Sequence, residues 1–125
     1  TYGGGDIPDA VVGGGIFIYN SSPTITNNEI VNNILYHGST KNFWGGGIYT
    51  RGLTGPPVQP VISYNLIQGN SADPPSGSGS NYSQGFGGGI YLGDRSAPLI
   101  VGNTLRSNRA VVGVDVARLR SRRSR

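Results

Sequence analysis

The chain has 125 residues, enough for a single domain, and 22 of them are Gly, 8 are Pro and only 13% are charged. It contains no Cys, which excludes disulfides, Cys-based metal sites and thiol nucleophiles. No apolar run approaches the roughly 20 residues that cross a bilayer, so no membrane span is predicted. The sequence contains no Met and no recognisable signal peptide, so we expect a processed form or a fragment.

The first predicted element, residues 9–13, resembles a later segment, residues 109–113. A Gly-Gly-Gly-Ile block follows at residues 13–16 and recurs at 45–48 and 87–90. After each block, apolar and Tyr or Phe residues alternate, which predicts a short strand with one face inward. The chain therefore opens at the close of one coil and begins new coils near residues 13, 45, 87 and 113.

A second block has the pattern P-x-I-x-x-N-x-[I/L]-x-x-N and occupies residues 23–33, 60–70 and 98–108. Each copy predicts two short strands separated by a two-residue bend. Units that repeat over this length indicate a solenoid, in which each unit buries its apolar side only by stacking on its neighbours. We expect an all-β solenoid of about three to four coils, each with three short strands.

Stacking coils places like residues over like, about 4.8 Å apart. The expected interior columns are Ile16, Ile48 and Ile90; Ile18, Thr50 and Leu92; Ile25, Ile62 and Ile100; and Ile30, Ile67 and Leu105. Asn28, Asn65 and Asn103 fall in the bends, because Asn tolerates the left-handed conformation and hydrogen-bonds locally. Stacked, these three residues are predicted to form a polar ladder that satisfies buried backbone groups.

Two laps carry insertions at one corner, residues 36–44 and 73–86, which we expect to lie side by side. The outward residues of the neighbouring strands form an aromatic column. Aromatic faces at this spacing, beside a loop wall, would stack on sugar rings. The alternatives are that the loop aromatics fold over the column, or that the strip contacts a protein. The candidate ligand-binding residues are Phe17, Tyr49, Tyr91, Tyr36, Trp44, Tyr82 and Phe86.

The paired Gly-Gly-Gly-Ile and I-x-x-N blocks resemble the right-handed parallel β-helix repeats of the pectate-lyase-like superfold. They look most like repeats of bacterial surface and autotransporter passenger proteins. The resemblance covers about residues 8–116. It implies a right-handed parallel β-helix, an extracellular or cell-surface location and a carbohydrate ligand. Because this superfold also includes lyases and hydrolases, it does not fix the function.

The residues offer little for catalysis. No acidic residue recurs at a repeat position, and Asp73 with Asp94 is the only pair of acids on extended loops that we consider able to converge. Arg51 and Asp94 are expected to meet in a surface salt bridge. His37 lacks a second His or a Cys partner, so no metal and no cofactor are predicted.

The net charge of +4 comes from a tail, residues 117–125, which we expect to be disordered and separate from the coils at 1–116. Its Arg residues lack interleaved aromatics, so we do not predict specific nucleic-acid binding.

The sequence thus favours a non-catalytic secreted or cell-surface module, structural or adhesive, with carbohydrate as its expected ligand. The alternatives are a fragment of a polysaccharide lyase or glycoside hydrolase, and a solenoid that stacks end to end into a homo-oligomer.

Overall fold

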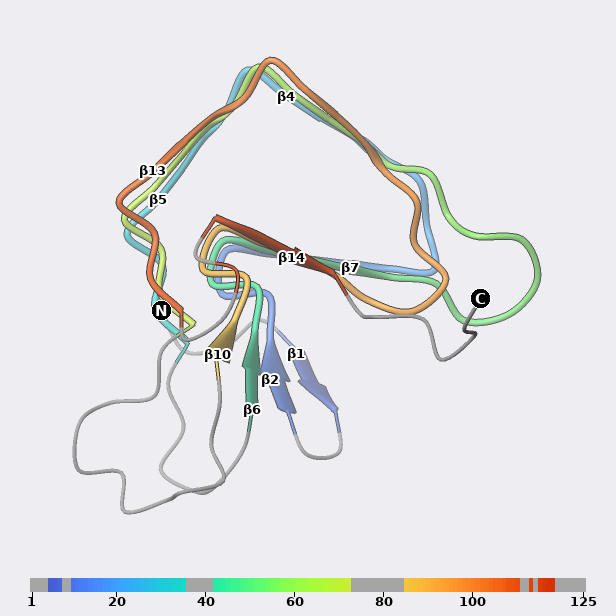
Figure 1. Ribbon diagram of the computed structural model, residues 1–125. Helices are drawn as coiled ribbons and strands as arrows, with labels where there is room; N and C mark the ends of the chain where they lie inside the picture. The colour runs from blue at the N-terminus through green and yellow to red at the C-terminus, as the bar shows by residue number, and fades with distance from the viewer. Residues whose placement is uncertain are drawn as a thin grey trace, which may run out of the picture.

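The structure, a computed structural model, describes residues 5–7, 10–35, 42–72, 85–110, 113 and 115–118. Every regular element in this part of the chain is a short β-strand. The strands stack into parallel sheets around a common axis, and Figure 1 views the resulting tube from its end. The protein is therefore a parallel β-helix-like solenoid, as the repeats predict.

Three sheets enclose the tube, and we call them walls 1, 2 and 3. Wall 1 contains β3 (Ile16–Tyr19), β7 (Ile48–Arg51), β11 (Ile90–Leu92) and β14 (Val116–Arg118). Wall 2 contains β4 (Thr24–Thr26), β8 (Val61–Ser63) and β12 (Leu99–Val101). Wall 3 contains β5 (Glu29–Val31), β9 (Leu66–Gln68) and β13 (Thr104–Arg106).

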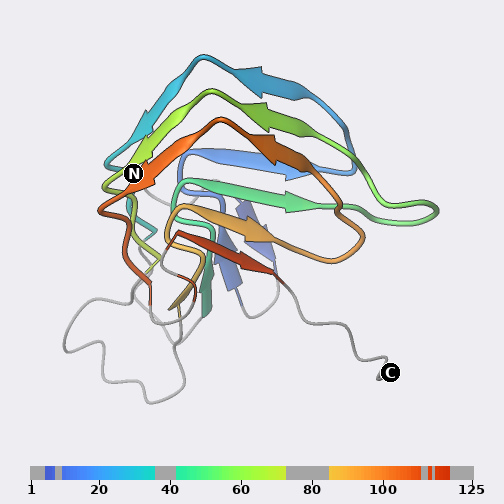
Figure 2. The same ribbon diagram turned by 45° about the horizontal axis from the view of Figure 1, so that its top comes forward.

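The chain visits the walls in the order 1, 2, 3 in each lap, and we number the coils 1 to 4 from Gly13, Gly45, Gly87 and Gly113. In Figure 1 coil 1 lies at the back and coil 3 in front. Figure 2 shows β7 running to the right while the strands of wall 2 run to the left. The chain therefore winds anticlockwise toward the viewer of Figure 1, which is a right-handed coil, the usual sense for parallel crossovers.

A fourth sheet, which we call the side sheet, lies beside the tube and was not expected from the sequence. It contains β1 (Gly5–Ile7), β2 (Ala10–Val12), β6 (Asn42–Trp44) and β10 (Gly85–Phe86). The last three are parallel, whereas β1 pairs antiparallel with β2 at the edge. Each full lap thus has a fourth short strand, just before its Gly-Gly-Gly block (Figure 1).

The expected register is confirmed at every interior column. Ile16 pairs with Ile48 and Ile48 with Ile90 in wall 1. The other columns, in walls 1, 2 and 3, pair in the same way. Their side chains form the principal core of the tube, in which Ile48, Ile62 and Ile67 are fully buried. The columns show why Ile recurs: a stiff, β-branched side chain suits a pleated, buried position.

The ladder of Asn28, Asn65 and Asn103 is present. The Asn65 side chain accepts a hydrogen bond from the backbone N–H of Asn28 at 2.9 Å and donates to the carbonyl of Ile25 at 2.9 Å. Asn103 repeats both bonds toward coil 2. Asn65 and Asn103 therefore each tie their coil to the backbone of the preceding coil.

The conformational reason expected for these Asn residues was wrong. The left-handed residue of each bend is the one before the rung: Asn27, Tyr64 or Gly102. The rung residue is selected instead by its amide, which offers one acceptor and one donor to the neighbouring coil. A second ladder with the same geometry, unforeseen in the sequence, is formed by Asn33, Asn70 and Asn108.

Glycine is required at the corner between the side sheet and wall 1. Gly45, which begins coil 2, has a φ of 73°, where side chains are strained. At Gly47 the reason is crowding, since a Cβ would lie 2.6 Å from the carbonyl oxygen of Gly89 in the next coil. The Gly blocks therefore serve close coil stacking.

The last described strand, β14, runs from Val116 to Arg118, and Ala117 pairs with Tyr91. A further insertion, which the sequence reading missed, occupies residues 52–59 between β7 and β8 and projects from the right-hand corner in Figures 1 and 2. It is held by Asn20 and Ser22 of coil 1, whose side chains accept hydrogen bonds from the backbone of Leu53 and Gln59.

Candidate functional site

The candidate site is a group of side chains packed between wall 1 and the side sheet, outside the tube. We call it the aromatic cluster, and it consists of Val12, Phe17, Trp44, Tyr49, Phe86, Tyr91 and Ala117. Residue alternation along β3, β7 and β11 turns Phe17, Tyr49 and Tyr91 away from the tube interior. Trp44 and Phe86 reach the same space from β6 and β10.

The rings of the cluster are close enough to stack. The Tyr49 and Tyr91 rings lie 5.7 Å apart at an interplanar angle of 9°. The Trp44 ring stacks on Tyr91 at 5.4 Å and 16°. Phe17 continues the column, with its ring 5.4 Å from that of Tyr49. Offset rings at these distances attract one another, so the cluster is a second small core of the protein.

The expected column of Phe17, Tyr49 and Tyr91 is therefore present in register, but it is not an open strip. Tyr49 is 1% exposed and Tyr91 5% exposed. The partly exposed aromatic rings of the cluster are Phe17, Trp44 and Phe86. One alternative drawn from the sequence was that loop aromatics fold over the column. Trp44 and Phe86 pack against the column in this way.

The remaining candidates, Tyr36 and Tyr82, lie outside the described residues, as do most of the two insertions. The strands and bridges that flank the insertions do stack, because Trp44 pairs with Phe86 and Ile34 bridges to Ser71. The insertions therefore start and end at one corner, as expected.

The Tyr49 hydroxyl has an unusual environment. Burial raises the pKa of Tyr49 to about 12, against a smaller opposing effect of the Arg51 guanidinium, which also hydrogen-bonds to it. Burial likewise raises the pKa of Tyr91. Both phenols are thus neutral hydrogen-bond donors near pH 7, and neither is poised to act as a general base.

Among the residues that the structure describes, the charged candidates do not come together as a catalytic group. Arg51 and Asp94 both act electrostatically on Tyr49. Arg95 donates to the carbonyl of Gly55 at 2.7 Å. Within the described ranges, no three His, Cys, Asp or Glu side chains group as metal ligands. His37 and Asp73 lie outside those ranges.

Sequence reasoning missed a buried polar pair inside the tube. Thr50 occupies a place that Ile18 and Leu92 fill in the neighbouring coils. Its hydroxyl lies 2.8 Å from that of Ser96, and both residues are buried. Thr50 was a visible departure from the Ile column, but Ser96 lies in the connection between β11 and β12, outside the repeated positions.

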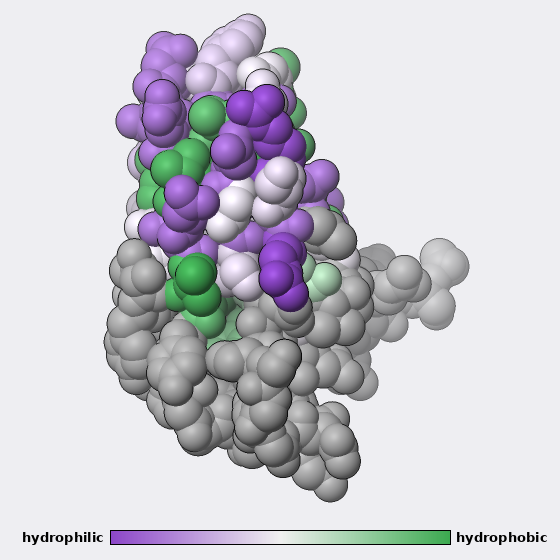
Figure 3. Space-filling model, turned by 90° about the vertical axis from the view of Figure 1, so that its left-hand side faces the viewer, coloured by the Kyte–Doolittle hydropathy of each residue, from purple (hydrophilic) through white to green (hydrophobic). Residues whose placement is uncertain are grey.

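The outer face of wall 3 is exposed at Glu29, Thr104 and Arg106. Figure 3 shows hydrophilic and hydrophobic residues intermixed on this side, with no continuous apolar patch. Arg106 donates to Gln68 across the coils at 2.6 Å, so part of the polar surface is also used between coils.

In comparisons with known proteins, no family model, no curated protein and no solved structure matched the chain. Among the described residues there is no helix long and apolar enough to cross a membrane.

Proposed function

We propose that this chain is a non-catalytic structural module, a right-handed β-helix of the kind found in secreted and cell-surface proteins. The observation that carries the proposal is the double Asn ladder. Its rungs occupy the polar repeat positions of the chain and bond to the backbone of the preceding coil. The repeated Asn residues therefore stiffen the stack of coils. A rigid rod that presents loops at its corners suits a scaffold or adhesin.

Carbohydrate is the proposed ligand, and one observation favours it. The aromatic cluster has a buried base, Tyr49 and Tyr91, and partly exposed rings above it, including Trp44. Aromatic rings held at fixed spacing offer apolar faces on which pyranose rings stack. Because stacking fixes the base, a sugar would meet pre-oriented rings, which lowers the ordering cost of binding.

The tryptophan gives a direct test, because Trp44 is the only Trp of the chain. Neutral and acidic oligosaccharides are titrated into the protein while Trp emission is recorded. We expect a saturable change in Trp emission with at least one oligosaccharide. The Phe86→Leu variant should bind it with much lower affinity, because it loses the ring whose centroid lies 6.3 Å from that of Tyr91. A Val61→Thr variant on wall 2 is the control and should bind normally.

An emission spectrum that stays constant across the whole panel would remove the carbohydrate proposal and leave the scaffold. The enzyme alternative is tested separately, by incubating the chain with polyuronates with and without calcium. Release of unsaturated or reducing products at a rate above the buffer would overturn the non-catalytic assignment.

A further inference from the structure

The bend between walls 2 and 3 carries an exposed aromatic side chain that the repeat does not require. Its left-handed position is occupied in coils 1, 2 and 3 by Asn27, Tyr64 and Gly102, with φ of 60°, 56° and 69°. Gly and Asn adopt this region readily, whereas a bulky side chain there is an outlier. Tyr64 gains no burial in return, because it is 62% exposed. A residue that is both strained and exposed points to a function rather than to stability.

The Tyr64 ring is nevertheless held in place by the next coil. It lies against Gly102, where a Cβ would collide with the ring atoms Cδ1 and Cε1. The backbone N–H of Tyr64 donates to the carbonyl of Val101 at 3.1 Å, which ties the bend to coil 3. A flat ring that is fixed at the surface is already oriented for stacking, so little ordering cost opposes a ligand there.

Polar groups lie beside this ring in coil 1. Because Thr26 pairs with Ser63, Asn27 holds the same place as Tyr64, about 4.8 Å along the axis. Asn27 is exposed, and no described residue hydrogen-bonds to its side-chain amide. The Thr26 hydroxyl accepts a hydrogen bond from Ser63 at 3.0 Å and keeps its own O–H as a donor. The ring is therefore flanked by an amide that both donates and accepts, and by a hydroxyl.

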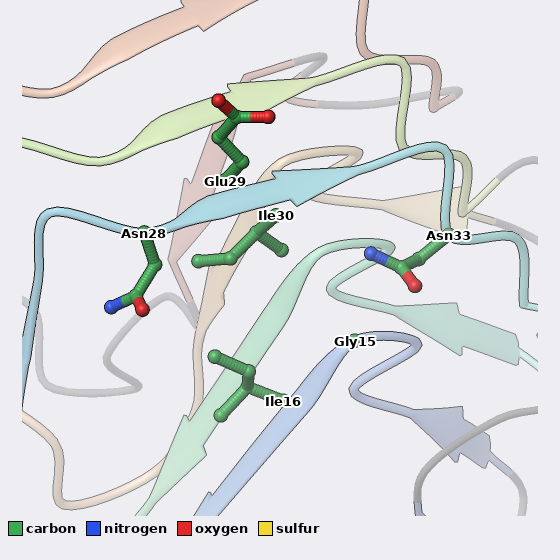
Figure 4. A pocket seen from close by; sticks show the side chains of 6 residues that line it. All are labelled: Gly15, Ile16, Asn28, Glu29, Ile30 and Asn33. Atoms are coloured by element: carbon green, nitrogen blue, oxygen red, sulfur yellow. The ribbon is translucent and has the colours of Figure 1, made fainter.

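A carboxylate lies close to these groups. Glu29 follows Asn27 by two residues and is exposed. Figure 4 shows its side chain on the side of β5 opposite to Ile30, which faces the tube interior. The negative charge of Glu29 on the outer face disfavours anionic ligands at the bend. The bend therefore suits a neutral ligand.

We propose that Tyr64, Asn27 and Thr26 form a binding site for a neutral pyranose sugar. The sugar ring stacks on Tyr64, and its hydroxyls bond to the Asn27 amide and the Thr26 hydroxyl. A purely apolar ligand would leave that amide unused. The site is separate from the aromatic cluster, because Figure 1 shows this bend at the top of the tube and the side sheet at the bottom. The inference thus goes beyond the proposed function and does not rest on binding at the cluster.

NMR on the isotope-labelled full chain tests the site directly. The neutral probes are cellotetraose, mannotetraose and galactotetraose, and tetragalacturonate is the anionic comparison. We expect saturable backbone amide shifts at Asn27, Tyr64 and Gly102 with at least one neutral probe. Tetragalacturonate should bind more weakly than the best neutral probe, because Glu29 repels it.

Variants of the full chain separate binding from folding. Tyr64→Gly removes the ring and should abolish saturable binding, yet it should unfold close to the denaturant midpoint of the parent, because Gly adopts this φ without strain. Tyr64→Phe keeps the ring and should bind within about twofold of the parent. Asn27→Gly removes the amide and should weaken binding about tenfold. Asn32→Gly is its matched control, because Asn32 is also left-handed in coil 1, with a φ of 57°, but lies at the next bend.

Three results would overturn the proposal: no saturable shift with any neutral probe, shifts that persist in Tyr64→Gly, or tighter binding of tetragalacturonate than of every neutral probe. The Phe86→Leu variant should leave the shifts at the bend unchanged. Tyr64→Gly should likewise leave the Trp44 emission titration unchanged. Failure at the bend is therefore distinguishable from failure of the proposed function.

Discussion

The tube interior and the aromatic cluster are built in different ways. The interior is made from positions that repeat in every coil, such as Ile25, Ile62 and Ile100, and each residue stacks on its own counterpart. The cluster joins residues of two sheets, and only its Phe17–Tyr49–Tyr91 column follows the repeat. The comparison shows that repetition secures a core along the axis, whereas sideways packing depends on residues peculiar to one coil.

The first way to break this comparison is to truncate the middle of an interior column. Ile62 has 0% exposure, so Ile62→Ala leaves a cavity between two fixed neighbours and should cost about 2–5 kcal/mol of unfolding free energy. Val61→Ala, on the outer face of the same strand, should cost less than about 1 kcal/mol. Denaturant unfolding measures both. Equal losses would show that the columns do not carry the stability.

The ladder offers the next largest effect. Asn65→Ala removes the acceptor for the Asn28 N–H and the donor to the Ile25 carbonyl, and two orphaned groups should cost about 2–4 kcal/mol. The same substitution at Asn28, the exposed first rung, should cost about 1 kcal/mol or less. Thermal and denaturant unfolding compare the two variants. An equal loss of stability in the two variants would contradict the conclusion that a rung stabilises the protein by bonding to the preceding coil.

The buried hydroxyl pair tests a position where one coil departs from the repeat. Thr50→Val restores an apolar column but leaves the Ser96 hydroxyl buried without its partner, at a cost of about 1–3 kcal/mol. Adding Ser96→Ala should recover most of that loss, because both polar groups are then gone. A double-mutant cycle checks the coupling, and additive losses would speak against a direct bond.

The smallest expected effect is a change in stability at alkaline pH, and it reports on the aromatic cluster alone. Folding raises the pKa of Tyr49 from 10.0 to about 12, so the folded state holds its proton more tightly than the unfolded state. This contribution is complete below pH 10 and is lost as the pH rises toward 12. Tyr49→Phe should therefore flatten the loss of stability in that window. Unfolding at pH 9 and pH 11 measures it, and parallel pH profiles for both proteins would refute the assignment.

The sequence was sufficient to predict the parts that repeat. The interior columns, one Asn ladder and the common corner of the two insertions follow from spacing alone, because coils with equal motifs place equal residues in register. The second ladder was also within reach, since Asn33, Asn70 and Asn108 recur at fixed spacing. The ladder was not predicted because these residues stand at the end of the motif, where the turn that follows already explained an Asn.

The sequence was not sufficient where contacts join different motifs. The side sheet depends on pairing of Ala10–Val12 with Asn42–Trp44, which share no residue identity. Burial of Tyr49 and Tyr91 depends on side chains from that sheet, so alternation could predict the side of the strand but not its cover. Ser96 contacts Thr50 from the connection between β11 and β12, and no repeat in the sequence predicts this pair.

The insertion at residues 52–59 has a practical consequence for protein engineering. It lengthens one corner of coil 2, yet Ile62 still pairs with Ile25 and Ile100 on either side. The bend between walls 2 and 3 is fixed in length by its amide rung, whereas this corner accepts extra chain at little entropic cost. Foreign epitopes or binding loops grafted at the exposed residues 53–57 would be displayed from a platform that Val58 and Gln59 keep attached to the neighbouring coils.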